Sequence, residues 1–425
     1  MAMKQITRRR FLSNSAVAGA GIATLAAAPS AALGRASRND TLRVAIVGPG
    51  GRGQSLMREF FEFAKQYNAQ MTGVCDVWTR RRDEAIELVK EAHGAAPKVY
   101  RRLDDVLADK DIDAVIIGTA DHQHAKMLQA SVEAGKDVYV EKPMANVLEE
   151  ANAAFAAVQR SDAIVQIGTQ RRSWPKYRAA EKMLKSTPLG DIVRVEIIGN
   201  ACSPYRWRRS DADITAAREK DVDWQGFLMG KPDRPYDPRI FRCFRLFREF
   251  SGGIVDQWMS HAIDAVHMLT GESHPNSAVA HGGIYKYHDF RENADTISVA
   301  FEYGKGAKKF LVTYDVCLIN ASGRGCRLMG TRGTLHYENA GWRFSGNDVT
   351  FDDRISTDVE VQDDPDAMHH MANWLDCVRR RDPSSLYCDA AAGYGHSVAC
   401  VLATESYWTG RRLEFNPQTK ELASV

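Results

Sequence analysis

Gly48, Gly50 and Gly53 have the spacing of a turn that binds a pyrophosphate. They follow the apolar run 44–47, which is short enough for a buried strand, and residues 55–61 after them have helical spacing. In such a unit the first glycine allows the tight turn, the second lets the backbone approach the pyrophosphate, and the third lets the helix pack closely on the strand. The phosphates lie at the helix N-terminus, where unpaired N–H groups attract negative charge. Because an ordinary glycine turn has the same pattern, the surroundings decide whether a dinucleotide binds at Gly48, Gly50, Gly51, Arg52 and Gly53.

The residue that ends the next apolar run favours NAD as that dinucleotide. Asp76 follows the run 71–75 and lies about 20 residues beyond Gly53, the place of the acidic residue that hydrogen-bonds the ribose 2′-hydroxyl. Arg80, Arg81 and Arg82 follow closely. These arginines either hold the 2′-phosphate of NADP or form a solvated first turn of the next helix. We expect NAD, and NADP stays open as the alternative.

Two later apolar runs end in residues that could carry chemistry. The run 113–118 leads into Thr119-Ala120-Asp121-His122-Gln123-His124, and the run 137–140 leads into Glu141-Lys142-Pro143. Ligands of a doubly wound sheet bind outside the carboxyl ends of its strands, so both sets are expected beside the nicotinamide end of the cofactor. A lysine with little access to water there has a pKa lowered toward that of a proton-transfer group. The alternative for Lys142 is a surface lysine in a loop.

Two kinds of pattern position these residues. Predicted strands alternate with helices through the first half, at 43–47, 70–75, 98–100, 113–118, 137–140 and 163–167, which indicates a parallel, doubly wound sheet. Beyond residue 170 the runs 192–198, 296–301 and 309–314 alternate apolar and polar residues, which predicts a sheet with one solvated face. The irregular stretch 203–249 is too long for a bare connection, and we expect a substrate-side insertion or an oligomer contact there.

The first forty residues resemble a twin-arginine export signal. Arg8, Arg9 and Arg10 precede a small, apolar stretch at 16–28. That stretch is shorter than the ~20 residues of a membrane span, so we expect no span in the mature chain. The predicted organisation is a signal at 1–40, a Rossmann domain that binds NAD(P) at 41–167 and a substrate and oligomerisation domain at 168–425. The expected location is the periplasm or another extracytoplasmic compartment.

Composition narrows the partners. The formal charge is only +2, and acidic and basic residues are interspersed, so nothing indicates nucleic acid or a membrane surface as a partner. The eight cysteines show no C-x-x-C spacing, and we interpret them as buried small hydrophobes. Asp121, His122, His124 and a distant His261 have the residue types of a zinc site, but their spacing is unspecific, and we expect no metal.

Taken together, the glycine turn, Asp76, Thr119-Ala120-Asp121-His122-x-His124 and Glu141-Lys142-Pro143 resemble the Gfo/Idh/MocA family, named for glucose-fructose oxidoreductase and inositol dehydrogenase. The resemblance runs from about residue 42 to 415, and Glu141-Lys142-Pro143 is its most specific part. It implies an α/β fold, with an N-terminal Rossmann domain and a C-terminal α/β domain whose open sheet is mostly antiparallel. It also implies NAD(P)-dependent chemistry on a sugar or polyol and a homo-oligomer, a dimer or tetramer.

The resemblance also implies roles for single residues. Lys142 and His261 flank the reacting carbon, where His261 suits the base for a hydroxyl proton and Lys142 stabilises the alkoxide. The residues expected to face the cofactor are Thr119, Asp121, His122, His124, Glu141, Lys142 and Gln170, and the stretch 121–124 is also expected to face the substrate, without metal. Candidate substrate contacts are Lys142, Arg171, Tyr205, Gln257 and His261.

One position departs from the family pattern. Gln257 stands where the family has an aspartate four residues before the histidine, and an amide cannot take a proton. Either the neighbouring Asp256 replaces it, or Lys142 and His261 move the proton alone, or the chemistry differs from alcohol oxidation. We favour the second interpretation.

The expected export restricts the chemistry, because no nicotinamide pool exists outside the cytoplasm. We therefore expect an oxidoreductase for a sugar, polyol or related secondary alcohol that keeps its cofactor bound and recycles it on a second carbonyl compound. The alternatives are a redox-neutral glycosidase, which oxidises its substrate transiently, eliminates the leaving group and reduces the product again, and a secreted binding protein that lost catalysis. The glycosidase ranks second because the usual histidine- and glycine-rich motif is not evident at 251–261.

Overall fold

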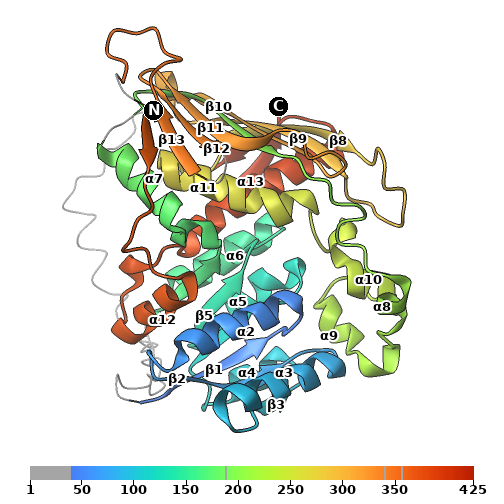
Figure 1. Cartoon of the computed structure of the whole chain (residues 1–425). Coiled ribbons are helices and arrows are strands. Elements are labelled where there is room, and N and C mark those ends of the chain that lie inside the picture. The colour runs from blue at the N-terminus through green and yellow to red at the C-terminus, as the bar shows by residue number, and fades with distance from the viewer. Residues whose placement is uncertain (1–39, 187–188, 339–340, 356–357) are drawn as a thin grey trace, which may run out of the picture. The chain divides into compact units, whose positions relative to one another are not determined.

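Two sheets organise the chain (Figure 1). The computed structural model describes residues 40–186, 189–338, 341–355 and 358–425, so nearly all of the predicted export signal lies outside the described residues. The described residues fall within one compact unit. No helix among them is long and apolar enough to cross a membrane.

The N-terminal sheet has six parallel strands in the order β3-β2-β1-β4-β5-β6. Its apolar runs are short and buried on both faces, which is typical of parallel strands covered by helices. The strands are β1 (Leu42–Val47), β2 (Ala69–Cys75), β3 (Lys98–Tyr100), β4 (Ala114–Ile117), β5 (Asp137–Glu141) and β6 (Val165–Gly168). The helices between them are α2 (Gly51–Ala64), α3 (Thr79–His93), α4 (Leu103–Ala108), α5 (His124–Glu133) and α6 (Leu148–Gln159). The predicted doubly wound sheet is confirmed, because this is the strand order of the Rossmann fold.

The second sheet has ten strands, of which only β7 and β10 pair in parallel. In the order of the sheet they are β14 (Val359–Val361), β13 (Gly341–Ser345), β12 (Thr334–Glu338), β11 (Arg324–Gly330), β7 (Ile192–Gly199), β10 (Phe310–Cys317), β9 (Thr296–Tyr303), β8 (Ser277–Gly283), β15 (Leu413–Asn416) and β16 (Glu421–Ser424). Buried and more exposed residues alternate along β9 and β10, as the sequence pattern predicts for a sheet with one solvated face. The expected mostly antiparallel sheet is therefore confirmed.

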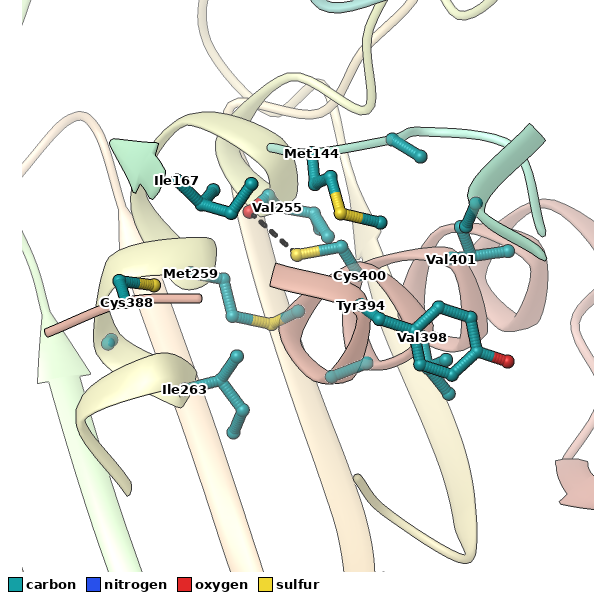
Figure 2. Close-up of a cluster of buried hydrophobic side chains, with 14 of the residues drawn as sticks. Met144, Ile167, Val255, Met259, Ile263, Cys388, Tyr394, Val398, Cys400 and Val401 are labelled. Carbon is teal, nitrogen blue, oxygen red and sulfur yellow. Dashed lines mark hydrogen bonds between the residues drawn. The ribbon is translucent and has the colours of Figure 1, made fainter. Parts of the chain in front are cut away.

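Long helices join the two halves. The helices of the second half are α7 (Pro175–Ser186), α8 (Asp211–Thr215), α9 (Trp224–Leu228), α10 (Pro238–Cys243), α11 (Ser260–Thr270), α12 (His370–Arg380) and α13 (Ala390–Thr409). Figure 2 shows α13 contributing Val398 and Cys400 to a buried cluster that also holds Met144 and Ile167 from the N-terminal half and Met259, which precedes α11. Helix α12 packs against α2 in a second cluster. The last helices thus fix the N-terminal sheet against the second half.

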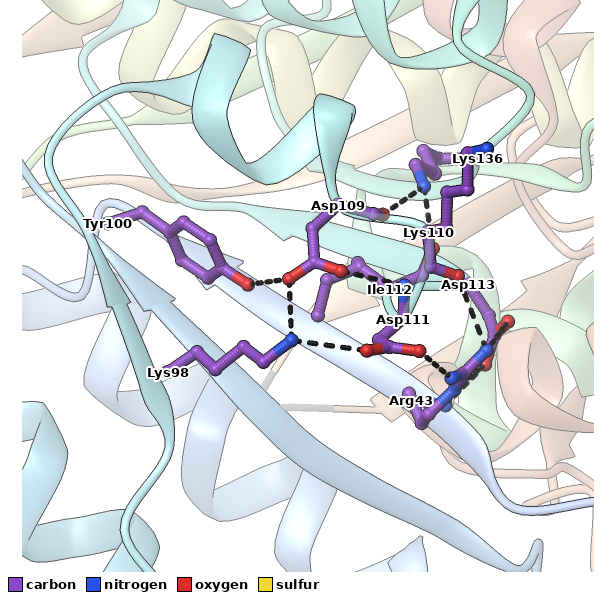
Figure 3. Close-up of polar contacts among 9 residues, drawn as sticks. All are labelled: Arg43, Lys98, Tyr100, Asp109, Lys110, Asp111, Ile112, Asp113 and Lys136. Atoms are coloured by element: carbon purple, nitrogen blue, oxygen red, sulfur yellow. Dashed lines mark hydrogen bonds and ion pairs between the residues drawn. The ribbon is translucent and has the colours of Figure 1, made fainter.

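The amino ends of the parallel strands carry a network of charges (Figure 3). Arg43 pairs with Asp113 at 3.0 Å and with Asp111 at 2.8 Å, and Lys98 pairs with Asp109 at 3.0 Å. These ion pairs connect the segments at the amino ends of the parallel strands. The opposite, carboxyl edge holds the residues that the sequence singled out.

Candidate active site

The glycine turn has the shape that a pyrophosphate requires. Gly48 has a φ of +79°, and a Cβ there would lie 2.6 Å from Thr119; a Cβ on Gly53 would lie 2.1 Å from the carbonyl oxygen of Gly48. A Cβ on Gly50 or Gly51 would meet no heavy atom within 4 Å. Helix α2 begins at Gly51, and no side chain caps it. The first turn therefore offers free N–H groups beside open space, which fits the phosphates of a dinucleotide.

A cavity of about 500 Å³ extends from this turn. One wall comes from the carboxyl ends of the parallel strands, with Gly48, Gly50, Asp76 and Thr119. The facing wall comes from the irregular segment 203–249, which we call the roof segment. Its lining residues are Arg209, Gln225, Gly226, Phe227, Met229, Phe241, Arg242, Phe244 and Arg245. The expected substrate-side insertion thus lines the cofactor cavity.

The roof segment is anchored to the N-terminal domain by backbone and charge. Asp223 N–H donates to the Val77 carbonyl at 2.8 Å, and the Asp223 carboxylate pairs with Arg102 at 2.8 Å. Phe227 is buried in an aromatic cluster, and its carbonyl accepts from the His122 ring at 2.8 Å. These contacts hold the roof segment over the cavity.

Asp76 lies at the end of β2 and lines the cavity. Its carboxylate accepts the Trp78 N–H at 2.7 Å, and burial raises its pKa to about 6. Of the three arginines that follow, Arg80 and Arg81 both pair with Glu84, whereas Arg82 donates to the Asp76 carbonyl. Arg81 lines the cavity, and Asp76 beside it is placed to accept a hydrogen bond from a ribose hydroxyl.

Gln257 connects the two halves at the predicted catalytic position. Its side-chain oxygen accepts from Lys142 Nζ at 3.3 Å and from Arg245 at 2.8 Å. Its amide nitrogen donates to Asp121 at 2.5 Å, and Ser251 donates to the same carboxylate at 2.6 Å. The neutral amide thus accepts from two cations on one side and donates to a carboxylate on the other.

The backbone before α11 takes part in this network. Residues Val255–Met259 form a π-helical turn, a wider turn that is frequent at functional sites. The carbonyls of Asp256 and Gln257 accept from Lys142 Nζ at 3.4 and 3.1 Å. The ammonium group of Lys142 is therefore held by the turn itself as well as by the Gln257 side chain.

Burial shifts the proton affinities here. It lowers the pKa of Lys142, an effect that the negative charges of Asp121 and Glu141 oppose. Burial and the charge of Asp121 raise the pKa of Asp256 to about 7, although the Gly252 N–H donates to its carboxylate at 2.5 Å. Both groups are thus brought toward the range in which proton transfer occurs near neutral pH.

His261 lies at a second cavity, of about 480 Å³, which also holds Arg171 and Trp258. Burial and the positive charges of Lys142 and Arg171 lower the pKa of the His261 imidazole well below its usual value. Its Nδ1 atom is buried without a hydrogen-bond partner among the described residues. Burial and the neighbouring cations therefore favour the neutral ring, which lines the cavity while its Nδ1 atom is buried.

Glu141 and Gln170 form a network behind the glycine turn. The Glu141 carboxylate accepts from Arg52 at 2.7 Å and from Gln170 at 3.0 Å. Burial opposes its ionisation, but the charges of Arg52 and Lys142 and the hydrogen bond from Arg52 together outweigh that effect and lower the pKa of Glu141. Arg52 lines the cofactor cavity, whereas Glu141 and Gln170 do not. These two residues therefore position Arg52.

The predicted His122 and His124 are both buried and bind backbone. His122 contacts the Phe227 carbonyl of the roof segment, and His124 contacts the Pro143 carbonyl at 2.8 Å. Burial lowers the pKa of both rings. Within the described ranges, no group of three or more His, Cys, Asp or Glu side chains is arranged to hold a metal ion.

One predicted substrate contact lies apart from this site. Tyr205 is exposed, and its ring lies 5.0 Å from that of Tyr287, outside both cavities.

The prediction of buried cysteines is wrong for Cys202, which is exposed because it lies in the irregular chain after β7. Cys317 and Cys326 are half-buried, and all eight cysteines are free.

Arg245 and Ser251 join the network at Gln257, and neither was singled out from the sequence. Both contact the Asp121 and Gln257 pair. Arg245 lies in the roof segment, where no periodic pattern or motif marks one arginine among many. Only the tertiary contacts identify it.

Comparison with known proteins identifies similar sequences. Residues 42–169 match the model of the oxidoreductase family with an NAD-binding Rossmann fold, and residues 232–336 match the GFO/IDH/MocA C-terminal domain. A glycosyl hydrolase family 109 protein of Shewanella baltica is 32% identical over 95% of this chain and 94% of its own. An inositol 2-dehydrogenase/D-chiro-inositol 3-dehydrogenase of Shouchella clausii is 26% identical over 44% of this chain and 53% of its own.

Solved structures share the fold. The aldose-aldose oxidoreductase from Caulobacter crescentus has a TM-score of 0.64 at 17% identity and covers 88% of this chain and 100% of its own. The WlbA dehydrogenase from Bordetella pertussis has a TM-score of 0.62 at 18% identity, over 88% and 99% of the two chains. With its Rossmann sheet, its glycine turn and its Glu141-Lys142-Pro143 strand end, this chain belongs to the Gfo/Idh/MocA family of NAD-binding oxidoreductases.

Proposed function

We propose that this enzyme acts on a sugar, polyol or related secondary alcohol, and that its NAD stays bound and returns to its starting redox state in every turnover. The observation that carries the proposal is the roof segment, which lines the cofactor cavity and is anchored through Asp223, Phe227 and their partners. In this proposal, these contacts slow the release of the cofactor. Slow release is a disadvantage for a dehydrogenase that exchanges its cofactor and an advantage for one that recycles it.

The residues around the reacting carbon have separate tasks in this proposal. When bound, NAD supplies a hydride acceptor and, once reduced, a hydride donor. His261 is the proposed acceptor of the hydroxyl proton of the substrate, since its ring is neutral and the residue lines the second cavity. Lys142 donates a hydrogen bond to the oxygen that gains negative charge. Gln257 transfers no proton and orients Lys142 and Arg245.

Two reaction cycles return the cofactor to its starting state. In the first, a sugar is oxidised and a second carbonyl compound is reduced at the same site. In the second, the enzyme is a redox-neutral glycosidase. The nearly full-length similarity to glycosyl hydrolase family 109 proteins favours the second cycle, although the histidine- and glycine-rich motif is not evident at 251–261.

One pair of assays separates these cycles. The NAD-loaded protein is incubated with a panel of nitrophenyl glycosides, and separately with free aldoses plus a carbonyl acceptor. Release of nitrophenol without net reduction of NAD supports the glycosidase, whereas conversion of the acceptor supports the oxidoreductase. Binding of sugars without turnover, unchanged in Lys142→Met, would instead support a binding protein.

Export and self-association complete the proposal. Arg8 to Arg10 support a twin-arginine signal, which cell fractionation tests: replacement of Arg8 and Arg9 by lysine should leave the protein in the cytoplasm. Val193, Val279 and Leu311 are exposed on strands of the ten-stranded sheet, which supports a homo-oligomer. Light scattering of the purified protein tests it, and a monomer at all concentrations would contradict it.

A further inference from the structure

The cavity at His261 is lined by side chains that suit a sugar ring. Five aromatic residues line it, namely Trp174, Tyr177, Trp258, Tyr314 and Tyr337. They come from the chain around α7, from the π-helical turn and from β10 and β12. Aromatic faces pack against the apolar C–H faces of a sugar ring, and tyrosine hydroxyls and the indole N–H supply polar contacts. At about 480 Å³, the cavity has the size of a small-molecule site.

The charge of this cavity is unbalanced. Arg171 and Arg324 line it, and no aspartate or glutamate does. Among the described residues, no ion pair joins either guanidinium to a carboxylate. An arginine is always protonated, so two positive charges face the empty volume without a compensating protein charge.

Three other arginines in this part of the structure do pair with a carboxylate. Arg172, the next residue, pairs with the buried Asp264 at 2.8 Å. Arg178 on α7 pairs with Glu181, and Arg327 on β11 pairs with Glu196. Arg171 therefore differs from these three arginines, each of which has a protein carboxylate.

Arg171 also lies close to the reacting centre. Its positive charge is among the causes that lower the pKa of His261, after burial and Lys142, so the guanidinium and the imidazole are near neighbours in one cavity. A substrate with a hydroxyl at His261 can thus place another substituent at Arg171. The planar guanidinium binds oxyanions through two parallel N–H groups.

We propose that this cavity selects a sugar that carries an oxyanion, such as a uronic acid carboxylate, and that Arg171 is the residue that binds the oxyanion. This inference rests on the proposed function, because it assigns the substrate class of the same site. Arg324, at the start of β11, adds positive charge at the exposed side of the cavity. Sulfate and phosphate esters of sugars also carry an oxyanion, and the test below distinguishes them from a carboxylate.

Calorimetric titration of the full-length, NAD-loaded protein tests this inference. The probes are D-glucuronate and D-galacturonate with their neutral parents, D-glucose and D-galactose, and also glucose 6-sulfate and glucose 6-phosphate. We expect at least one anionic sugar to bind about tenfold more tightly than its neutral parent, and the preferred member identifies the oxyanion. Equal or better binding of the neutral sugars, or no binding of any anionic sugar, would overturn the proposal.

Matched variants assign the effect to Arg171. Arg171→Gln should remove the preference for the anion and leave the neutral sugar within about twofold, and Arg171→Lys should retain part of the preference. The control is Arg194→Gln, on β7, whose side chain is exposed, pairs with Glu196 and does not line the cavity. An equal loss for anionic and neutral sugars in Arg171→Gln would contradict the assignment.

The absorbance of reduced nicotinamide is followed in the same samples. Anion-selective binding without any change in cofactor or sugar, both here and in the assays with nitrophenyl glycosides and a carbonyl acceptor, would uphold this inference and contradict the proposed function. Turnover of neutral sugars alone would support the proposed function and contradict this inference. The two conclusions therefore fail separately.

Discussion

The side-chain amide of Gln257 donates to the carboxylate of Asp121 at 2.5 Å, across the boundary between the two halves of the chain. The oxygen of the same amide accepts from Lys142 at 3.3 Å. The family pattern has an aspartate here, which would place two carboxylates side by side. In this protein a neutral group connects the buried carboxylate to the cation.

The variant Gln257→Glu tests whether an uncharged side chain is needed beside Asp121. The new carboxyl group would lie against Asp121, so the pair would keep a proton that the unfolded chain loses near its ordinary pKa. A carboxyl group whose pKa is higher in the folded state than in the unfolded state stabilises the folded protein at a pH below the unfolded pKa. This stabilisation is lost as the pH rises. We therefore expect the Tm of the variant, relative to the wild type, to fall between about pH 5 and about pH 8. The exposed Gln159→Glu is the control, and an equal Tm difference at both pH values would contradict the account.

Asp256→Asn should change stability with pH in the opposite direction. In the wild type, the folded protein keeps a proton on Asp256 up to about pH 7, whereas the unfolded chain loses it near pH ~4. The unfolded state then binds fewer protons, so the wild type loses stability as pH rises through this window. An asparagine does not titrate, so the variant should gain roughly 2 °C in Tm relative to the wild type between about pH 4 and about pH 8. A constant difference in thermal scans would refute the raised pKa.

Lys142→Met should reduce kcat at least ~100-fold, because the ammonium group supplies the hydrogen bond to the developing negative charge. The Lys142 side chain does not line the cofactor cavity, so the affinity for NAD should remain within about twofold of the wild type. Lys90→Met, on the exposed face of α3, is the control. Full activity in Lys142→Met would remove lysine from the mechanism.

Asp223→Asn should loosen the roof segment. The change removes the charge that pairs with Arg102 and Arg101 and keeps an oxygen that caps α9. The arginines are exposed, so the loss is modest, and we expect NAD to dissociate about fivefold faster. Stopped-flow displacement of the bound cofactor measures this rate, with Asp211→Asn on α8 as the control. An unchanged rate would mean that the roof segment does not retain the cofactor.

The sequence predicted most of the N-terminal half because its signals are local. The central strands β1, β4, β5 and β6 are short runs buried on both faces, and the glycine turn that follows β1 is a local motif. Alternation also predicted β7, β9 and β10 of the second sheet. The order of the strands in that sheet did not follow from the pattern, because strand pairing depends on contacts far apart in sequence.

The candidate site was predicted in part. Lys142, Gln257 and His261 came from motif positions, and the structure brings Lys142 and Gln257 into hydrogen-bond contact. The bond from Gln257 to Asp121 and the role of Arg245 were not predictable, because they arise where an irregular segment folds over the cavity. Aromatic packing such as that of Phe227 holds this segment and leaves no periodic pattern in the sequence.

The most direct test of the central claim is the cofactor content of the protein as isolated. The chain is purified without added nucleotide and denatured, and the released nicotinamide is identified and quantified by mass spectrometry. The account predicts near-stoichiometric NAD, retained beneath the roof segment. An empty protein that also fails to bind added NAD or NADP would contradict it.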